Sequence, residues 1–175
     1  MVGILIALLA LFLDQLTKSL APMWQMPHER TLIPGFLHLA YTENRGAAWS
    51  FLAGQAWGIY LLSLLSLLAA IAFAVGFARS RDKQLRLIFS LLFAGAVGNL
   101  IDRIRLGYVV DFIDIQLGSY HWPTFNVADA CLVVGVLLFL LWSWRRGQQD
   151  KPKLAEESDL SSLPSSEGEE ADREA

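Results

Sequence analysis

The most informative part of the sequence is GAVGNLIDRIRLGYVVDFIDIQLGSYHWPTFNVADAC, residues 95–131. It joins two apolar runs, and polar residues lie where the runs meet the connection: Asn99 and Asp102 before it, Asp111 within it, and Asp129 after it. Charged and amide side chains at such positions are costly to bury unless they have partners or a role. We therefore predict that Asp111 and Asp129 meet in space and form a two-aspartate active site.

The composition is typical of a membrane protein. Of the 175 residues, 54% are hydrophobic and only 18% are charged, a balance that soluble domains rarely show. The formal net charge of −3 hides an asymmetry. Residues 1–153 carry 13 Lys and Arg against nine Asp and Glu, whereas residues 154–175 carry eight acidic residues and one arginine. We expect residues 147–175 to form a disordered acidic tail in the cytoplasm.

Four apolar segments are long enough to cross a bilayer, which takes about 20 residues of helix. Within a membrane domain of residues 1–146, we predict membrane helices over residues 3–21, 56–78, 87–104 and 127–144. Basic residues follow the second helix at 79–86 and the fourth at 145–153. Basic loops face the cytoplasm, so both termini are cytoplasmic and the connections 22–55 and 105–125 face outside.

Both outer connections contain a piece with the alternation of a β-strand, at residues 36–42 and 108–115. In the second piece, this alternation places Asp111 on the face opposite Phe112.

The polar residues of the spans fall in one layer when the helices are measured at about 1.5 Å per residue. Asp14 lies about 17 Å along the first helix and Asn99 about 18 Å along the third, counted from their cytoplasmic ends. Asp111 follows the outer end of the third helix, and Asp129 lies in the first turn of the fourth. Four separate segments thus bring polar groups to the outer leaflet, which is our main argument for a site.

Structural roles compete with this interpretation at several positions. Asp14 and Lys18 are four residues apart and share a helix face, so they form either an ion pair that lets the helix face the bundle or a polar contact beside the site. Asp102 beside Arg103 is interpreted as a structural ion pair, with Asp102 as an alternative member of the catalytic pair.

A second structural alternative concerns the start of the fourth helix. Asn126 suits an N-cap, and Asp129 three residues later has the spacing of a capping box. Capping alone would explain these two residues but not Asp111 or Asn99.

In its motifs the chain resembles the lipoprotein signal peptidases, also called signal peptidase II, which are bacterial membrane aspartyl proteases. The resemblance covers about residues 10–145, and it rests on the joint order of five motifs. They are Asp14-Gln15-Leu16-Thr17-Lys18, Asn44-Arg45-Gly46-Ala47-Ala48, Gly98-Asn99 with Asp102-Arg103, Val109-Val110-Asp111-Phe112, and Phe125-Asn126-Val127-Ala128-Asp129. One departure is Trp49, where family members usually carry Phe.

The resemblance implies that Asp111 and Asp129 are the catalytic pair. It assigns supporting or substrate-binding roles to Asp14, Lys18, Asn44, Gly46, Asn99, Asp102, Arg103 and Asn126. It also implies a four-helix membrane bundle with a small extracytoplasmic sheet, to which residues 36–42 and 108–115 would contribute.

The resemblance further implies a substrate and a location. The substrate is a prolipoprotein whose cysteine carries diacylglycerol, cut on the amino side of that cysteine in the bacterial cytoplasmic (inner) membrane. Membrane lipids and globomycin-type inhibitors are the other expected partners. We expect no nucleic-acid partner, and we expect no metal or cofactor because the chain has no Cys/His ligand cluster.

The chemistry expected of two adjacent carboxyl groups is general acid–base catalysis. Both cannot ionise easily when they are close, so one keeps its proton while the other activates a water. The N-terminus of a helix favours an anion at Asp129, so we predict that Asp111 holds the shared proton. Two rivals remain: a small membrane transporter or proton-relay protein that uses Asp14 and Lys18, and a scaffold whose polar layer only joins helices.

Overall fold

The computed structural model describes residues 1–46, 55 and 57–161, and it describes only the backbone of residues 149–161. Its helices are α1 (Val2–Leu20), the short 3-10 helix η1 (Ala21–Trp24), α2 (Gly58–Arg79), α3 (Lys83–Leu106) and α4 (Val127–Ser161). Within the described residues, four segments are long and apolar enough to span a membrane, namely Val2–Trp24, Gly58–Arg79, Lys83–Leu106 and Val127–Gln148. The predicted four-span fold is confirmed.

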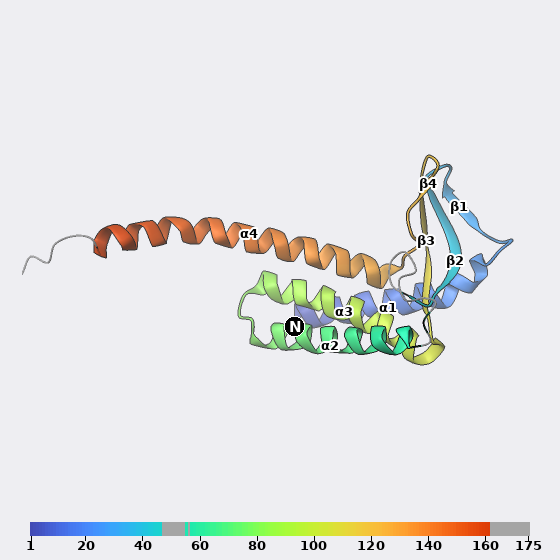
Figure 1. The fold of residues 1–175 in the computed structure, drawn as a ribbon, viewed down its shortest axis with the longest axis horizontal. Helices are drawn as coiled ribbons and strands as arrows, with labels where there is room; N and C mark the ends of the chain where they lie inside the picture. The colour runs from blue at the N-terminus through green and yellow to red at the C-terminus, as the bar shows by residue number, and fades with distance from the viewer. Residues whose placement is uncertain (47–54, 56, 162–175) are drawn as a thin grey trace, which may run out of the picture. The chain divides into compact units, whose positions relative to one another are not determined.

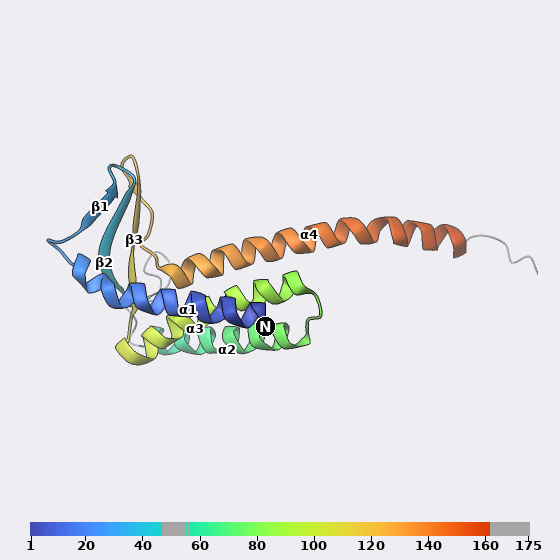
Figure 2. The ribbon, with the colours of Figure 1, turned by 180° about the vertical axis from the view of Figure 1, so that it is seen from behind.

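Helix α3 lies between α1 and α2 and contacts both (Figures 1 and 2). It begins at an N-cap, Asp82, whose carboxylate accepts hydrogen bonds from Gln84 N (2.7 Å) and Leu85 N (3.2 Å). It ends at Gly107, whose φ of 77° is left-handed and favours glycine. Half-way along, Gly95 allows α4 to approach closely, because a Cβ there would lie 2.5 Å from the carbonyl oxygen of Ala128.

A four-stranded antiparallel sheet lies at one end of these helices (Figures 1 and 2). In spatial order it contains β1 (Arg30–Ile33), β2 (Leu37–Asn44), β3 (Val109–Leu117) and β4 (Tyr120–His121). The central pair β2–β3 confirms the two predicted strands and joins the two predicted outer connections. In this register Thr42 lies opposite Asp111 and Asn44 opposite Val109, so β2 brings its end beside the predicted catalytic strand.

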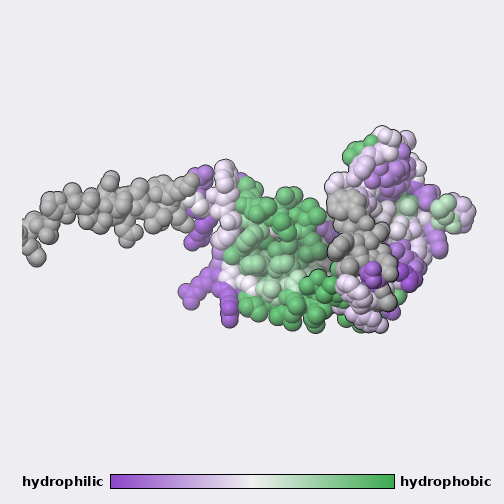
Figure 3. Space-filling model, viewed as in Figure 1, coloured by the Kyte–Doolittle hydropathy of each residue, from purple (hydrophilic) through white to green (hydrophobic). Residues whose placement is uncertain are grey.

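The two faces of β3 have different environments. On one face Phe112 and Val110 form a small core with Ala21, and the ring of Trp24 lies 5.7 Å from that of Phe112. Asp111 lies on the opposite face of β3, as the alternation predicts, and it lines a pocket. Hydrophobic residues cover the helical part of the surface in Figure 3, and hydrophilic residues gather over the sheet.

The fourth helix extends beyond its predicted end. We predicted that the span ends at residue 144 and that a disordered tail begins at 147, whereas α4 continues to Ser161. Residues 147–161 contain several good helix formers, including Lys, Glu, Ala and Leu. Residues 162–175 lie outside the described residues, so the disorder of the tail stays a prediction. Residues 47–54 also lie outside them, and with them Ala47, Ala48 and Trp49 of the second motif.

Candidate active site

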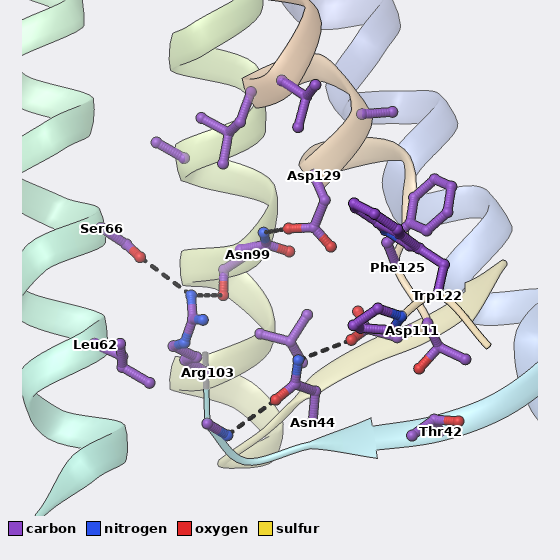
Figure 4. Close-up of a pocket in the computed structure, with 18 of the residues that line it drawn as sticks. Thr42, Asn44, Leu62, Ser66, Asn99, Arg103, Asp111, Trp122, Phe125 and Asp129 are labelled. Carbon is purple, nitrogen blue, oxygen red and sulfur yellow. Dashed lines mark hydrogen bonds between the residues drawn. The ribbon is translucent and has the colours of Figure 1, made fainter. Parts of the chain in front are cut away.

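Asp111 lies in β3 and is buried, with 1% of its surface exposed. Each of its carboxyl oxygens accepts a hydrogen bond from a side-chain amide. Asn44 Nδ2 donates to Oδ2 at 2.9 Å (Figure 4), and Asn126 Nδ2 donates to Oδ1 at 2.7 Å. Asn44 comes from the end of β2 and Asn126 from the residue before α4, so three separate segments meet at this carboxyl group.

The orientation of both amides is fixed by backbone N–H groups. The Oδ1 atom of Asn44 accepts a hydrogen bond from Gly46 N at 3.0 Å, and Oδ1 of Asn126 accepts one from Asp129 N at 2.9 Å. With each amide oxygen held by a backbone donor, the NH2 groups must point at Asp111. The predicted role of Gly46 therefore lies in its backbone, which orients Asn44.

Asp129 lies in the first turn of α4, where it accepts a hydrogen bond from Asn99 Nδ2 at 2.7 Å (Figure 4). Its other oxygen accepts one from Asn126 N at 3.2 Å, while Asn126 Oδ1 accepts one from Asp129 N. These two reciprocal bonds form a capping box. The capping alternative is thus confirmed, but it does not remove these residues from the site, since Asn126 also reaches Asp111.

Lys18 binds residues next to the two predicted catalytic aspartates and, in the part of the chain that the structure describes, contacts neither of them directly within hydrogen-bond distance. Its Nζ atom lies 2.9 Å from Asn99 Oδ1 and 3.0 Å from Asp14 Oδ2, which confirms the ion pair predicted from the i, i+4 spacing. The same ammonium lies 3.0 Å from Asp102 Oδ2. Our prediction of an Asp102–Arg103 ion pair is wrong, because consecutive helical residues point about 100° apart and Asp102 turns towards Lys18.

Arg103 instead faces α2. Its Nη1 atom donates to Ser66 Oγ at 3.1 Å and more weakly to the carbonyl oxygen of Asn99 at 3.5 Å (Figure 4). Sequence reasoning missed Ser66, which lies in a span without charged residues, and it missed Gln15. The Nε2 atom of Gln15 lies 3.2 Å from both Asp14 Oδ2 and Asp102 Oδ1. The only signal for Gln15 was its place in the first motif.

The environment of Asp111 favours its protonated form. Burial, followed by the negative charge of Asp129, raises the pKa of Asp111 from 3.8 to about 7. The hydrogen bonds from Asn44 and Asn126 act in the opposite direction and prevent a larger rise. At neutral pH the Asp111 carboxyl group can therefore hold a proton beside a second carboxyl group, which is the requirement for acid–base catalysis by a pair.

Both aspartates line a single pocket of about 1310 Å³ (Figure 4). One part of its wall is apolar and comes from the membrane helices, with Leu62, Leu65 and Phe73 on α2 and Val133 on α4. Another part comes from the region of the sheet and includes Phe36, Ile115, Leu117 and Trp122. The carboxyl groups thus lie where an apolar groove of the helices meets the sheet. Fold and site together define a multi-pass membrane protein with the paired carboxyl groups expected of an aspartic peptidase.

Comparison with known proteins identifies the family. The sequence profile of Signal peptidase (SPase) II matches residues 6–145, and the chain belongs to this family. A lipoprotein signal peptidase of Syntrophotalea carbinolica is 42% identical over 147 residues, covering 82% of this chain and 91% of that protein. One of Staphylococcus aureus is 38% identical over 140 residues, covering 79% and 85%.

Solved structures agree with this assignment. A bacterial membrane enzyme determined by the in meso method matches with a TM-score of 0.76 and 34% identity, over 85% of this chain and 90% of that one. A second matches with a TM-score of 0.70 and 36% identity, over 80% and 90%. The predicted membrane peptidase is confirmed, and the rival interpretations of a transporter and a scaffold are set aside.

Proposed function

We propose that this protein removes signal peptides from diacylglyceryl-modified prolipoproteins, with Asp111 and Asp129 as the catalytic pair. It cleaves on the amino side of the lipidated cysteine. Membership of the signal peptidase II family supports the reaction. The observation that carries the catalytic assignment is the convergence of two carboxyl groups and three oriented amides, those of Asn44, Asn99 and Asn126, at the edge of an apolar pocket.

The mechanism uses one protonated and one ionised carboxyl group. Asp129 takes a proton from a water, whose oxygen attacks the scissile carbonyl carbon, while Asp111 gives its proton to the carbonyl oxygen. In the second step the C–N bond breaks, Asp129 returns its proton to the leaving nitrogen, and Asp111 recovers one from the tetrahedral intermediate. The amides of Asn44 and Asn126 hold the Asp111 carboxyl group, and that of Asn99 holds Asp129.

The place of the site fits an amphiphilic substrate. Acyl chains and an apolar signal peptide can lie against the α2 and α4 residues of the pocket wall without leaving the bilayer. The scissile bond then reaches the carboxyl groups at the end of the helices nearest the sheet, where water is available. In this arrangement both termini are cytoplasmic and the sheet is outside the cytoplasmic membrane of a bacterium. The same apolar pocket would take lipids and globomycin-type cyclic peptides.

The test is cleavage of a diacylglyceryl-modified prolipoprotein by the purified protein in lipid or detergent. Wild type is compared with Asp111→Asn and Asp129→Asn, and the matched control is Asp114→Asn. Asp114 lies on the same strand, but it contacts His121, whose side chain is exposed. We expect cleavage by wild type and by the control, and loss of cleavage in the two site variants with their folding retained. Cleavage by folded Asp111→Asn would refute the catalytic assignment.

A further inference from the structure

Three buried charged residues are not used by the mechanism. Asp14, Lys18 and Asp102 are each at most 4% exposed, and none of them lines the pocket. Their side chains therefore lie outside the pocket proposed to hold the substrate. Burying three charges is expensive, and apolar residues in their place are often as stabilising. Stability alone does not account for these three charges, so their role must lie in the groups that they contact.

The two carboxylates hold the backbone directly before each catalytic residue. Asp102 Oδ2 accepts a hydrogen bond from the N–H of Val110, the residue before Asp111, at 3.1 Å. Asp14 Oδ1 accepts one from the N–H of Ala128, the residue before Asp129, at 2.8 Å. These bonds reach two different elements, a strand and a helix, whose relative position determines how close the catalytic carboxyl groups are.

Lys18 links Asp14 and Asp102, the two carboxylates that accept these backbone hydrogen bonds. Its ammonium lies 3.0 Å from Asp14 and 3.0 Å from Asp102. It also donates to Asn99 Oδ1 at 2.9 Å, and this bond turns the NH2 group of Asn99 towards Asp129. Through Asp14 and Asp102, the Lys18 ammonium therefore fixes the backbone before both aspartates. Through Asn99 it also fixes the side chain of Asp129.

We propose that Asp14, Lys18 and Asp102 form a clamp that sets the separation of the Asp111 and Asp129 carboxyl groups. The proposal rests on the proposed function, because it concerns the geometry of that catalytic pair. The clamp residues are positioning residues that act through the backbone of β3 and α4. The absence of a side chain at Gly98 makes room for the clamp, since a Cβ there would lie 2.6 Å from Asp14 Oδ2.

The clamp can be tested by two substitutions that remove the same charge and differ in geometry. Asp102 contacts both Lys18 and Val110 through one atom, Oδ2. Asp102→Asn can keep both contacts with its single amide oxygen, and it loses only the hydrogen bond that Oδ1 accepts from Gln15 Nε2 at 3.2 Å. Asp14 uses Oδ1 for Ala128 and Oδ2 for Lys18, so Asp14→Asn must lose one of the two.

We expect Asp14→Asn to lower kcat at least tenfold with KM little changed, because a displacement of about 1 Å can cost about 10²-fold in rate. Asp102→Asn should keep kcat within about threefold of wild type, whereas Asp102→Ala, which removes the acceptor, should lose activity as Asp14→Asn does. The control is Leu92→Ala. It leaves a cavity where the buried side chain of Leu92 packs against Gly135 of α4, about two helical turns before Asn99. It should lower Tm without lowering kcat at temperatures where the variant is folded.

The outcomes separate this inference from the function on which it rests. If wild type does not cleave the lipidated substrate, the proposed function fails. If wild type cleaves and both Asn variants lower kcat equally, the loss of charge explains the effect and the clamp is refuted. If Asp102→Ala does not fold, the comparison of kcat between Asp14→Asn and Asp102→Asn still tests the clamp. A fall in kcat for Leu92→Ala equal to that of Asp14→Asn would likewise reduce the clamp to a contribution to stability.

Discussion

Replacing Asp111 by Asn should change how the stability of the folded protein depends on pH. In the wild type the pKa of Asp111 is about 7 in the folded state and 3.8 in the unfolded chain. Between these values the folded state binds the extra proton, so the free energy of unfolding falls as pH rises. At about 1.4 kcal/mol for each pKa unit, the full loss is about 4 kcal/mol and is complete above pH 8.

The Asn variant removes this pH dependence and adds a constant penalty. Its NH2 group must face the NH2 group of Asn44 or of Asn126, both of which are held in orientation by backbone donors. An unpaired buried donor costs about 1–3 kcal/mol. Asp111→Asn should therefore be less stable than wild type by about 1–3 kcal/mol at pH 4.5. Between pH 4.5 and pH 8.5 it should gain about 3 kcal/mol relative to wild type, because only part of the full loss falls within this range.

The assay is equilibrium unfolding in mixed micelles, with the six tryptophans as the fluorescent signal. Both proteins are measured in the same detergent from pH 4.5 to 8.5, and the difference in unfolding free energy is plotted against pH. A difference that stays constant over this range would refute the raised pKa of Asp111 and with it the assignment of the shared proton.

Two further substitutions test the packing around the pair. Gly98→Ala should destabilise the protein by about 1–3 kcal/mol, because the added Cβ would lie 2.6 Å from Asp14 Oδ2 and 3.1 Å from Ala128 Cβ. Its control, Gly147→Ala, adds a Cβ with no atom within 4 Å and should leave Tm unchanged or slightly higher; equal effects would contradict the close approach. Asn126→Ala should cost about 1 kcal/mol through the lost cap and should raise the pKa of Asp111 further, since the bond from Asn126 lowers it. Infrared titration of the Asp111 carboxyl group measures this change, and an unchanged or lower pKa would show that Asn126 does not bind it.

The spans and the central strands could be predicted because their signals are local. Residues 58–79 contain no charged residue before Arg79, and the strands β2 and β3 alternate. The outer strands β1 and β4 were not predicted, since they have four and two residues and are exposed throughout. A strand that short has no face to bury, so no periodic pattern arises.

The contacts of the site were predictable only where the residues are close in sequence. The Asp14–Lys18 pair and the capping box follow from spacings of four and three residues. The contacts of Lys18 with Asn99 and Asp102 join positions 81 and 84 residues apart, and the depth count along the helices could only place them in one layer. Which partners pair within that layer depends on the rotation of each helix, and this is why Asp102 was assigned to its neighbour Arg103.

In the proposed mechanism one carboxyl group of the pair is ionised while Asp111 holds a proton. The most direct test is the pH dependence of kcat/KM for cleavage of a diacylglyceryl-modified prolipoprotein by wild type, because this constant reports the ionisation of the free enzyme. We expect a bell-shaped profile that rises at acidic pH as the first carboxyl group ionises and falls around pH 7 as Asp111 loses its proton. A rate that keeps rising to pH 9 would contradict the account.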